Sequence, residues 1–281
     1  MPTPEITRID LPDGTRTYEI PELDGKKFPS VTTITGQVDK SRSLTPWASR
    51  ITAQFLKEKF LKVKTDKELL AIMENNRIWQ DARKYADMIK KREGDKGTRV
   101  HEFAAKVFRI LKEGKGDIDV DVDPDIEKPC MALMEWIEGN DVIPVALESK
   151  VWSENFRGYA GTLDAALLVN GRLGIWDFKT GKGVYDEHKL QVAAYFSAFR
   201  DMFQDLNVEE MGILRLDKET GFPDPHRYSP DEAEDYLAEF GLYCMIWHTK
   251  KDRELRERTA RAEAKKKLPK IPRKLPKEDP F

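Results

Sequence analysis

The chain has 281 residues, of which 40% are hydrophobic and 35% charged, enough for one large domain or two small ones with a sizeable core. Its formal net charge is −2, which excludes a strong overall field for attracting polyanions, so any such partner would need a local basic surface. No apolar run approaches the ~18 residues of a membrane span, and we expect no membrane association.

The N-terminus and the cysteines indicate the compartment. Residues 1–5 contain no basic stretch followed by an apolar one, so we expect no signal peptide. The two cysteines, Cys130 and Cys244, are too few for a disulfide framework and favour a reducing environment. We therefore expect a cytoplasmic protein.

The first third of the chain reads as short strands followed by helices. Residues 1–28 are polar with weakly alternating strands, and the β-branched segment Pro29–Thr35 could open a helix or end a strand. Thr45-Pro46 is typical of an N-cap followed by Pro at the first helical position. Residues 65–68 form a capping box that predicts a second start.

Glycines divide the next helical region. A helix is expected from about Asn76 to Arg92, and its basic side chains could either contact phosphates or form a solvated face. Gly94 and Gly97 are expected to break it, so that a new helix runs from Thr98 to Leu111 with His101 in its first two turns. A further helix should begin at Asp123-Pro124 and end near Gly139.

The stretch from Gly161 to Lys182 carries the clearest local signal. Asn170-Gly171 between two β-rich runs predicts a two-residue hairpin with a type I′ turn. In that register Asp164 lies directly opposite Asp177. Because side chains alternate along a strand, Lys179 shares the face of Asp177.

Both faces of this hairpin are apolar, which indicates a sheet covered on both sides. The face of the carboxylates holds Ala166, Leu168, Leu173 and Ile175, and the other face holds Leu163, Ala165, Leu167, Val169, Trp176 and Phe178. Two like charges about 5 Å apart cost roughly 3 kcal/mol at an effective dielectric constant of 20. One lysine offsets part of this repulsion, and a divalent cation held by oxygen ligands offsets it better.

The remaining elements surround the hairpin. A strand is expected over Val145–Trp152, with Glu148 among its polar residues, and an amphipathic helix over Asp186–Phe203. We expect another strand over Met211–Leu216 and a helix that begins at Ser229 and continues past Trp247. From about 250 the chain is basic. Its last dozen residues, rich in proline, are expected to be extended or disordered, either gripping phosphates or only solubilising the end.

The ordered motifs resemble the RecB-like branch of the PD-(D/E)xK nuclease superfamily, over roughly residues 28–200. The matching pieces are His101, the segment Gly158–Asp164, the Asp177-Phe178-Lys179 triplet followed by Thr180-Gly181, and Gln191 with Tyr195 four residues later. The segment Pro29–Ile34 resembles the small stand-alone members. An isolated pair of acids with a lysine is a weak pattern, whereas this ordered set is specific.

The resemblance implies a site and a reaction. Mg²⁺ or Mn²⁺ would be held by Asp164, Asp177, the backbone carbonyl of Phe178 and, unless it is an ordinary helical histidine, His101. His188 is the next candidate if His101 is not a ligand. Catalytic roles would fall to Asp164, Asp177, Lys179, Glu148, Gln191 and Tyr195, although Glu148 could be a surface residue and the last two a polar pair at the edge of the core. Nucleic-acid contacts would come from Ser30, Thr32, Lys182, Gln191 and Tyr195.

We therefore expect an α/β protein with a central mixed β-sheet flanked by helices, a restriction-endonuclease-like core with an N-terminal mostly helical lobe. The expected division is one nuclease domain over 1–250, with the helical lobe at about 40–140 and the catalytic core at about 141–250, followed by a basic tail over 251–281. Two cysteines cannot form the four-cysteine iron–sulfur cluster of some relatives.

The implied function is metal-dependent hydrolysis of DNA phosphodiester bonds, most simply by an exonuclease acting on single-stranded DNA or DNA ends. The resemblance places such an enzyme in DNA repair or recombination, in a bacterial or phage-infected cell. Two alternatives stay open: a structure-specific DNA endonuclease, and a catalytically inactive DNA-binding module of the same fold.

Overall fold

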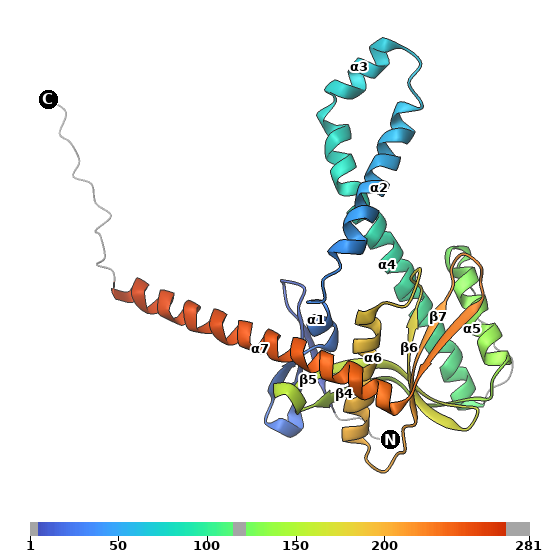
Figure 1. The fold of residues 1–281 in the computed structure, drawn as a ribbon, viewed down its shortest axis with the longest axis vertical. Coiled ribbons are helices and arrows are strands. Elements are labelled where there is room, and N and C mark those ends of the chain that lie inside the picture. The colour runs from blue at the N-terminus through green and yellow to red at the C-terminus, as the bar shows by residue number, and fades with distance from the viewer. Residues whose placement is uncertain (1–4, 115–121, 268–281) are drawn as a thin grey trace.

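The computed structural model describes residues 5–114 and 122–267, and it confirms an α/β architecture (Figure 1). Its centre is a mixed sheet of five strands in the order β4-β5-β6-β7-β8. The strands are β4 (Val142–Ser153), β5 (Tyr159–Val169), β6 (Arg172–Lys179), β7 (Glu210–Leu216) and β8 (Pro223–Tyr228). Among these five strands β6 and β7 pair in parallel and the other neighbours are antiparallel, and α6 (Asp186–Met202) connects β6 to β7.

The hairpin of β5 and β6 forms in the expected register. Asn170 and Gly171 have φ values of 53° and 82°, as a type I′ turn requires at both central residues. The pairs run from Val169↔Arg172 to Ala165↔Trp176. Asp164 and Asp177 therefore follow at the point where the regular pairing ends.

Strand β8 was not expected from the sequence. It contains Pro223 and Pro225, which are unusual in a central strand, but β8 pairs only with β7 and forms the edge of the sheet. An edge strand tolerates proline because one of its sides needs no backbone donors.

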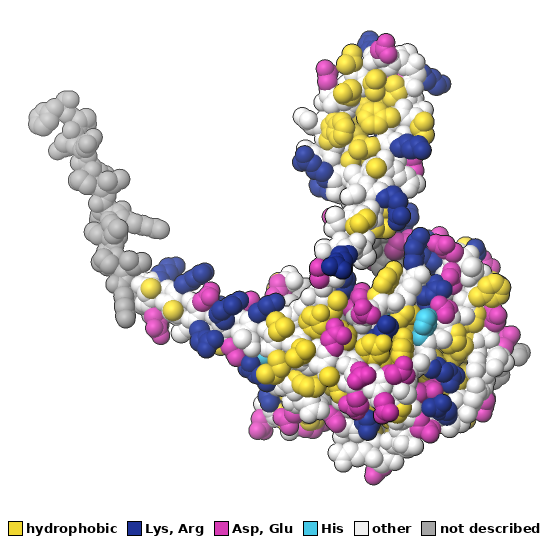
Figure 2. Space-filling view, in the orientation of Figure 1, with side chains coloured by type: hydrophobic (Ala, Val, Ile, Leu, Met, Phe, Trp, Pro, Cys, Tyr) yellow, Lys and Arg dark blue, Asp and Glu magenta, His cyan; other side chains and the backbone are white. Residues whose placement is uncertain are grey.

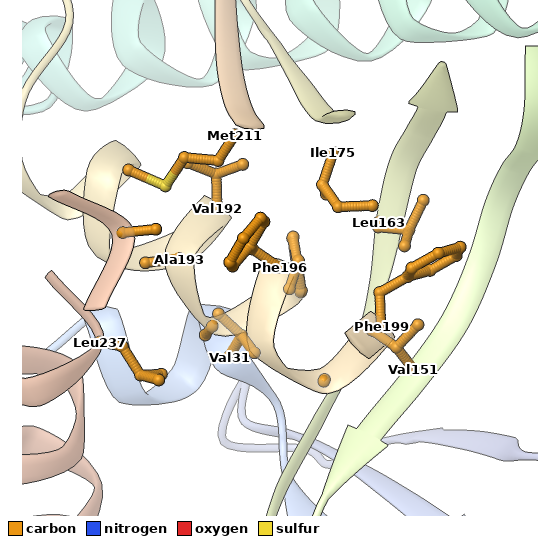
Figure 3. Close-up of a cluster of buried hydrophobic side chains, with 14 of the residues drawn as sticks. Val31, Val151, Leu163, Ile175, Val192, Ala193, Phe196, Phe199, Met211 and Leu237 are labelled. Atoms are coloured by element: carbon orange, nitrogen blue, oxygen red, sulfur yellow. The ribbon is translucent and has the colours of Figure 1, made fainter. Parts of the chain in front are cut away.

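The sheet is covered on both faces, as the two apolar faces of the hairpin predicted. On one face lie α6, α1 (Val31–Thr35) and α7 (Pro230–Lys267), and their side chains meet those of the sheet in the core shown in Figure 3. On the other face lie α4 (Asn76–Glu113) and α5 (Glu127–Glu138).

The expectation for Leu163 was wrong, because it packs in the α6 core and not on the α4 side (Figure 3). Ala166 lies in the same core, so strict alternation fails between these two positions. The backbone of the neighbouring strand β4 is irregular at the same level. Leu147 pairs with Ala165 and Ser149 pairs with Leu163, but Glu148 between them has a φ of 45°.

Three helical segments form an arm that projects from the body (Figure 1). They are α2 (Ser41–Phe60), α3 (Asp66–Glu74) and the first part of α4. No residue of α2 or α3 is buried. The start of α2 differs from the expectation at Thr45: Asp39 accepts a hydrogen bond from the Ser41 amide at 2.8 Å, and Pro46 lies inside the helix.

The expected break at Gly94 and Gly97 is absent, and α4 is one continuous helix from Asn76 to Glu113. A glycine inside a helix costs only about 1 kcal/mol relative to alanine. That cost is offset here by tertiary packing, because Val100, Phe103 and Val107 on the same helix are buried against the sheet.

The N-terminal segment folds onto β5. Strands β1 (Thr7–Asp10), β2 (Arg16–Ile20) and β3 (Lys26–Pro29) form an antiparallel sheet whose core includes Ala160 of β5. Ser30 then bridges to Ala160 in parallel. The single turns of 3₁₀ helix are Pro21–Leu23, Pro124–Ile126 and Asn155–Arg157.

Helix α7 starts as the sequence predicted. Ser229 Oγ accepts from the Glu232 amide at 3.3 Å, while the Glu232 carboxylate accepts from the Ser229 amide at 2.8 Å. The helix continues through residue 250 to Lys267, and the proline-rich end of the chain lies outside the described residues. Among the described helices, none combines the length and apolarity that crossing a membrane demands.

Candidate active site

Asp164 lies at the point where β5 and β6 separate. Its Oδ2 accepts a hydrogen bond from the backbone amide of Phe178 at 2.9 Å. The same oxygen is 3.3 Å from Nδ1 of His101 on α4. The carboxylate thus takes the place of the next backbone acceptor of the ladder and faces an imidazole from the helix above.

Asp177, on β6, is the most enclosed group of the cluster, with a residue exposure of 1%. Its Oδ1 accepts a hydrogen bond from Gln191 Nε2 at 3.1 Å. Its Oδ2 is buried and lies 2.6 Å from Lys179 Nζ, with which it forms an ion pair. A buried carboxylate oxygen in an ion pair retains capacity for a further cationic or hydrogen-bonding partner.

The two carboxylates have opposite pKa shifts. Burial raises the pKa of Asp177 to about 6, and the nearby Asp164 contributes to the rise. Burial also acts against ionisation of Asp164, but His101, Lys179 and the Phe178 amide together hold the pKa of Asp164 below its ordinary value. Such a divergence between neighbouring acids is characteristic of functional sites, although structural ion pairs produce it too.

The two cationic groups respond to these acids. Burial disfavours the charged form of Lys179, but Asp177 and Asp164 raise the pKa of the lysine above its ordinary value. Burial likewise acts to lower the pKa of His101, and the Asp164 carboxylate more than offsets it. At neutral pH the lysine is therefore a fixed positive charge beside the acid pair.

Gln191 on α6 links the acid to the lysine. It donates to Asp177, and its Oε1 accepts from Lys179 Nζ at 3.3 Å. Gln191 Nε2 also lies 3.5 Å from the hydroxyl of Tyr195, one turn further along the helix. Tyr195 is 3% exposed, and burial followed by the charge of Asp177 raises its pKa well above the ordinary value.

His101 reaches the site because α4 passes close to the end of β6. A Cβ atom at Gly97 would be 3.4 Å from Thr180 Oγ1, which places this part of the helix against the residue that follows β6. His188, the alternative, instead accepts a hydrogen bond from the Tyr185 amide at 3.3 Å through Nδ1. Burial and the charge of Lys179 lower the pKa of His188 to about 4.

Glu148 stands next to Asp164 across the β4–β5 ladder, between pairs that involve its two neighbours. It adopts a φ of 45°, in the left-handed region that a glutamate rarely occupies. Burial and the charge of Asp164 raise the pKa of Glu148. Such backbone strain persists only where the surrounding structure enforces it, and it concentrates at functional sites.

Three residues expected to contact nucleic acid, Ser30, Thr32 and Lys182, come from two separate segments of the chain. The hydroxyl of Ser30 is buried and caps α1 by accepting from the Thr33 amide at 2.9 Å, whereas Thr32 is exposed beside it. Lys182 is exposed after the end of β6 and lies 3.4 Å from Glu219. The roles of all three, and that of the Phe178 carbonyl as a metal ligand, stay predictions.

The donors present suit a hard divalent cation. Two carboxylates meet at the end of the hairpin, an imidazole contacts one of them, and an ammonium group contacts the other. Among the residues that the structure describes, no group of three or more His, Cys, Asp or Glu side chains forms a ready-made cage. Mg²⁺ usually keeps several waters and needs only one or two protein carboxylates, so this donor set fits it.

Sequence reasoning did not identify the aromatic and basic side chains beside this cluster as part of one surface. Trp47 of α2 and Tyr185 before α6 line a common cavity with Arg50, Lys90 and Lys182. Their sequence separation explains the omission, because no local spacing connects residue 47 with residue 185. Similarly, no motif marks the left-handed backbone of Glu148.

Comparison with known proteins gives only distant likenesses. No family model matches the chain, and no curated protein matches it. Among solved structures, LHK-Exo in complex with dAMP matches with a TM-score of 0.36 and 13% identity, covering 58% of this chain and 85% of that one. The structure of SSO0001 matches with a TM-score of 0.28 and 16% identity, covering 69% and 84% respectively. Likenesses at this level carry no argument about function.

Proposed function

We propose that this protein is a metal-dependent nuclease that hydrolyses phosphodiester bonds in DNA. The observation that carries the proposal is the convergence of Asp164, Asp177 and Lys179 at the end of one hairpin, with the buried Asp177 carboxylate 2.6 Å from the Lys179 ammonium. The ordered motifs that resemble RecB-like nucleases support it.

Asp164 and Asp177 would hold Mg²⁺ or Mn²⁺. His101 of α4 would be a further ligand, from the side on which it contacts Asp164. The bound cation would supply a water of lowered pKa and neutralise charge on the phosphate. Its presence would also relieve the repulsion between the two acids, which the protein otherwise offsets only with Lys179 and His101.

Lys179 supplies the fixed positive charge of the site. Its ammonium group is 2.6 Å from Asp177 and is held from the other side by Gln191. A cation fixed in this way stabilises the negative charge that develops on the phosphoryl oxygens without needing to reorganise during the reaction. Because the group is largely buried, at 17% side-chain exposure, solvent screens it little.

Gln191 and Tyr195 position these groups. The amide of Gln191 orients Asp177 with its nitrogen and Lys179 with its oxygen, so it fixes both the carboxylate and the ammonium group of the ion pair. Tyr195 packs against Gly161 and limits where Gln191 can move. Such supporting contacts commonly change metal affinity or activity about 10- to 100-fold when removed.

The finer assignment is an exonuclease acting on single-stranded DNA or DNA ends, with a structure-specific endonuclease and an inactive DNA-binding module as the rivals. A test uses three DNA substrates with Mg²⁺ or Mn²⁺: end-labelled single strands, end-labelled duplexes and closed single-stranded circles. An exonuclease degrades the linear single strands and leaves the circles intact, whereas an endonuclease opens the circles.

Two site variants and one control complete the test. Asp177→Asn and Lys179→Met should fold normally and lose cleavage. Glu234→Gln, which removes a 3.1 Å exposed ion pair to Arg200 away from the site, should cleave like the wild type. Retention of cleavage by either site variant would reject the assignment, and absence of cleavage by the wild type with every metal would favour the binding module.

A further inference from the structure

A cavity of about 530 Å³ lies between the arm and the body. Its walls come from α2, from α4, and from the segment that joins β6 to α6. Its volume is in the range of small-ligand sites, which are about 300–1,000 Å³. Figure 2 shows Lys and Arg side chains at the neck where the arm meets the body, and hydrophobic side chains along the arm above it.

Two aromatic side chains line this cavity from different parts of the fold. Trp47 comes from α2 in the arm and is half-buried, whereas Tyr185 comes from the body and is 44% exposed. The ring of Tyr185 is supported by the ring of His188, with centroids 5.4 Å apart in an edge-to-face arrangement. Exposed aromatic faces within a cavity provide stacking surfaces for planar groups.

The acidic side chains of the cavity are already engaged. Asp39 accepts a hydrogen bond from the Ser41 amide at 2.8 Å, and Glu187 pairs with Lys40 at 3.0 Å. Asp186 pairs with Lys189 at 3.1 Å, and Glu93 contacts Lys218. Glu93, Asp186 and Glu187 thus each have a cationic partner, whereas Asp39 contacts a backbone amide.

The cationic side chains are not all balanced in this way. Within the described part of the chain, neither Arg50 nor Lys90 has an ion-pair partner, and the Lys182–Glu219 contact of 3.4 Å is between two exposed groups. An exposed pair of that kind contributes little and is readily exchanged for a phosphate. The cavity thus offers positive charge to a ligand from three sides.

One wall of the cavity comes from the segment that directly follows β6, the strand of Asp177 and Lys179. Lys182 follows Lys179 by three residues, and Glu187 and His188 at the start of α6 interact electrostatically with Lys179. A polymer whose phosphate reaches Lys179 would place its neighbouring nucleotide near Tyr185.

We propose that this cavity is a subsite for single-stranded nucleic acid, in which Trp47 and Tyr185 stack on an unpaired base while Arg50, Lys90 and Lys182 bind the adjoining phosphates. Aromatic platforms combined with a cationic groove are how single strands are bound without sequence preference. A paired base cannot enter, because its faces are covered by its neighbours in the duplex. The subsite rests on the proposed function for its polymer, and it makes Trp47 and Tyr185 the determinants of strand selectivity.

Binding measurements on the full chain in EDTA test the subsite separately from cleavage. The readout is the fluorescence anisotropy of a fluorescein-labelled oligothymidylate, with a labelled duplex of equal length as the second probe. Trp47→Ala and Tyr185→Ala should each weaken single-strand binding about 5- to 150-fold, since one base stacked on an aromatic ring contributes roughly 1–3 kcal/mol. Duplex binding should not change.

Three further variants separate stacking from a loss of structure. Trp79→Ala, an exposed tryptophan of the arm that does not line the cavity, should bind like the wild type. Trp47→Phe should preserve the affinity but abolish the part of the intrinsic fluorescence quenched by the oligonucleotide. In Arg50→Gln/Lys90→Gln, the salt dependence of log K should become shallower by about 1.4, or roughly 0.7 for each lost phosphate contact on a single strand.

Unchanged single-strand binding by Trp47→Ala and Tyr185→Ala, with melting temperatures like the wild type, would overturn the subsite. So would an equal loss on single strands and duplexes. If Trp47→Ala and Tyr185→Ala do not selectively weaken single-strand binding but the wild type shows metal-dependent cleavage, the proposed function stands without this subsite. If they bind as expected and the wild type cleaves with no metal, the subsite stands and the proposed reaction is rejected.

Discussion

The ring of Tyr195 lies directly against the backbone of Gly161. A Cβ atom at this glycine would be only 2.4 Å from Cε1 of the tyrosine, which is closer than any such contact allows. We therefore expect Gly161→Ala to displace the ring and, through it, Gln191. Overpacking of this kind typically costs about 1–3 kcal/mol, which thermal or urea unfolding would measure. DNA cleavage should fall with it.

Gly183→Ala is the matched control for that substitution, because nothing lies within 4 Å of the added Cβ and its backbone needs no positive φ. It should leave both stability and cleavage unchanged. In the double variant Gly161→Ala/Tyr195→Ala the destabilisation should be less than the sum of the two single effects, since the clash is shared. Additive effects would show that the two residues do not interact as described.

Glu148 should show a trade between stability and activity. Its φ of 45° strains a glutamate, and glycine adopts the same backbone freely. We expect Glu148→Gly to unfold no more easily than the wild type, yet to cleave DNA more slowly because the carboxylate beside Asp164 is lost. Asp24→Gly, at a φ of 52° in the N-terminal turn, serves as control and should cleave normally. Normal cleavage by Glu148→Gly would show that Glu148 has no role in the active site.

Gln191 should matter for activity more than for folding. Replacing it by methionine removes the contacts to Asp177 and Lys179 while keeping a similar volume. We expect cleavage to decrease about 10- to 100-fold, the range typical of groups that orient metal ligands. Gln204→Met, which alters an exposed glutamine just beyond the same helix, should have no effect. The ratio of the two initial rates is the measurement.

Metal removal should abolish cleavage, and either Mg²⁺ or Mn²⁺ should restore it. An imidazole ligand favours Mn²⁺ relative to an all-oxygen site. His101→Asn should therefore lower the Mn²⁺-supported rate more than the Mg²⁺-supported rate, whereas His226→Asn on β8 should leave their ratio unchanged. Equal losses with the two ions would argue against coordination by His101.

The stability of the metal-free protein should depend on pH through Asp177. Its pKa is about 6 in the folded protein, above the ordinary 3.8, because burial disfavours its charged form. Between about pH 4 and pH 6 the folded state therefore holds a proton that the unfolded state has released, and this group's contribution to the free energy of unfolding falls as pH rises. Urea unfolding across this range should show a steeper decline for the wild type than for Asp177→Asn. Parallel curves would contradict the burial-driven shift.

The central hairpin was predictable because its determinants are local. Asn170 and Gly171 define the turn, the turn defines the register, and the register brings Asp164 and Asp177 to the same end. The helix starts at Thr65 and Ser229 were likewise visible as caps, and both side chains accept the expected amide hydrogen bonds.

What the sequence did not reveal depends on long-range packing. Gly94 and Gly97 read as a break, yet they lie within one helix because the buried residues that follow hold it against the sheet. Strand β8 was hidden by its prolines, which are acceptable only because it is an edge strand. The placement of Glu148 next to Asp164 required knowledge of an irregularity in β4 that no residue pattern announces.

The unbroken helix α4 gives the arm a mechanical consequence. At 1.5 Å per residue its 38 residues form a rod about 57 Å long, with one end in the arm and His101 in the part that rests on the sheet. A rod of this kind transmits tilt and does not absorb it. Movement of the outer end of α4 therefore changes the angle at which the imidazole of His101 meets Asp164.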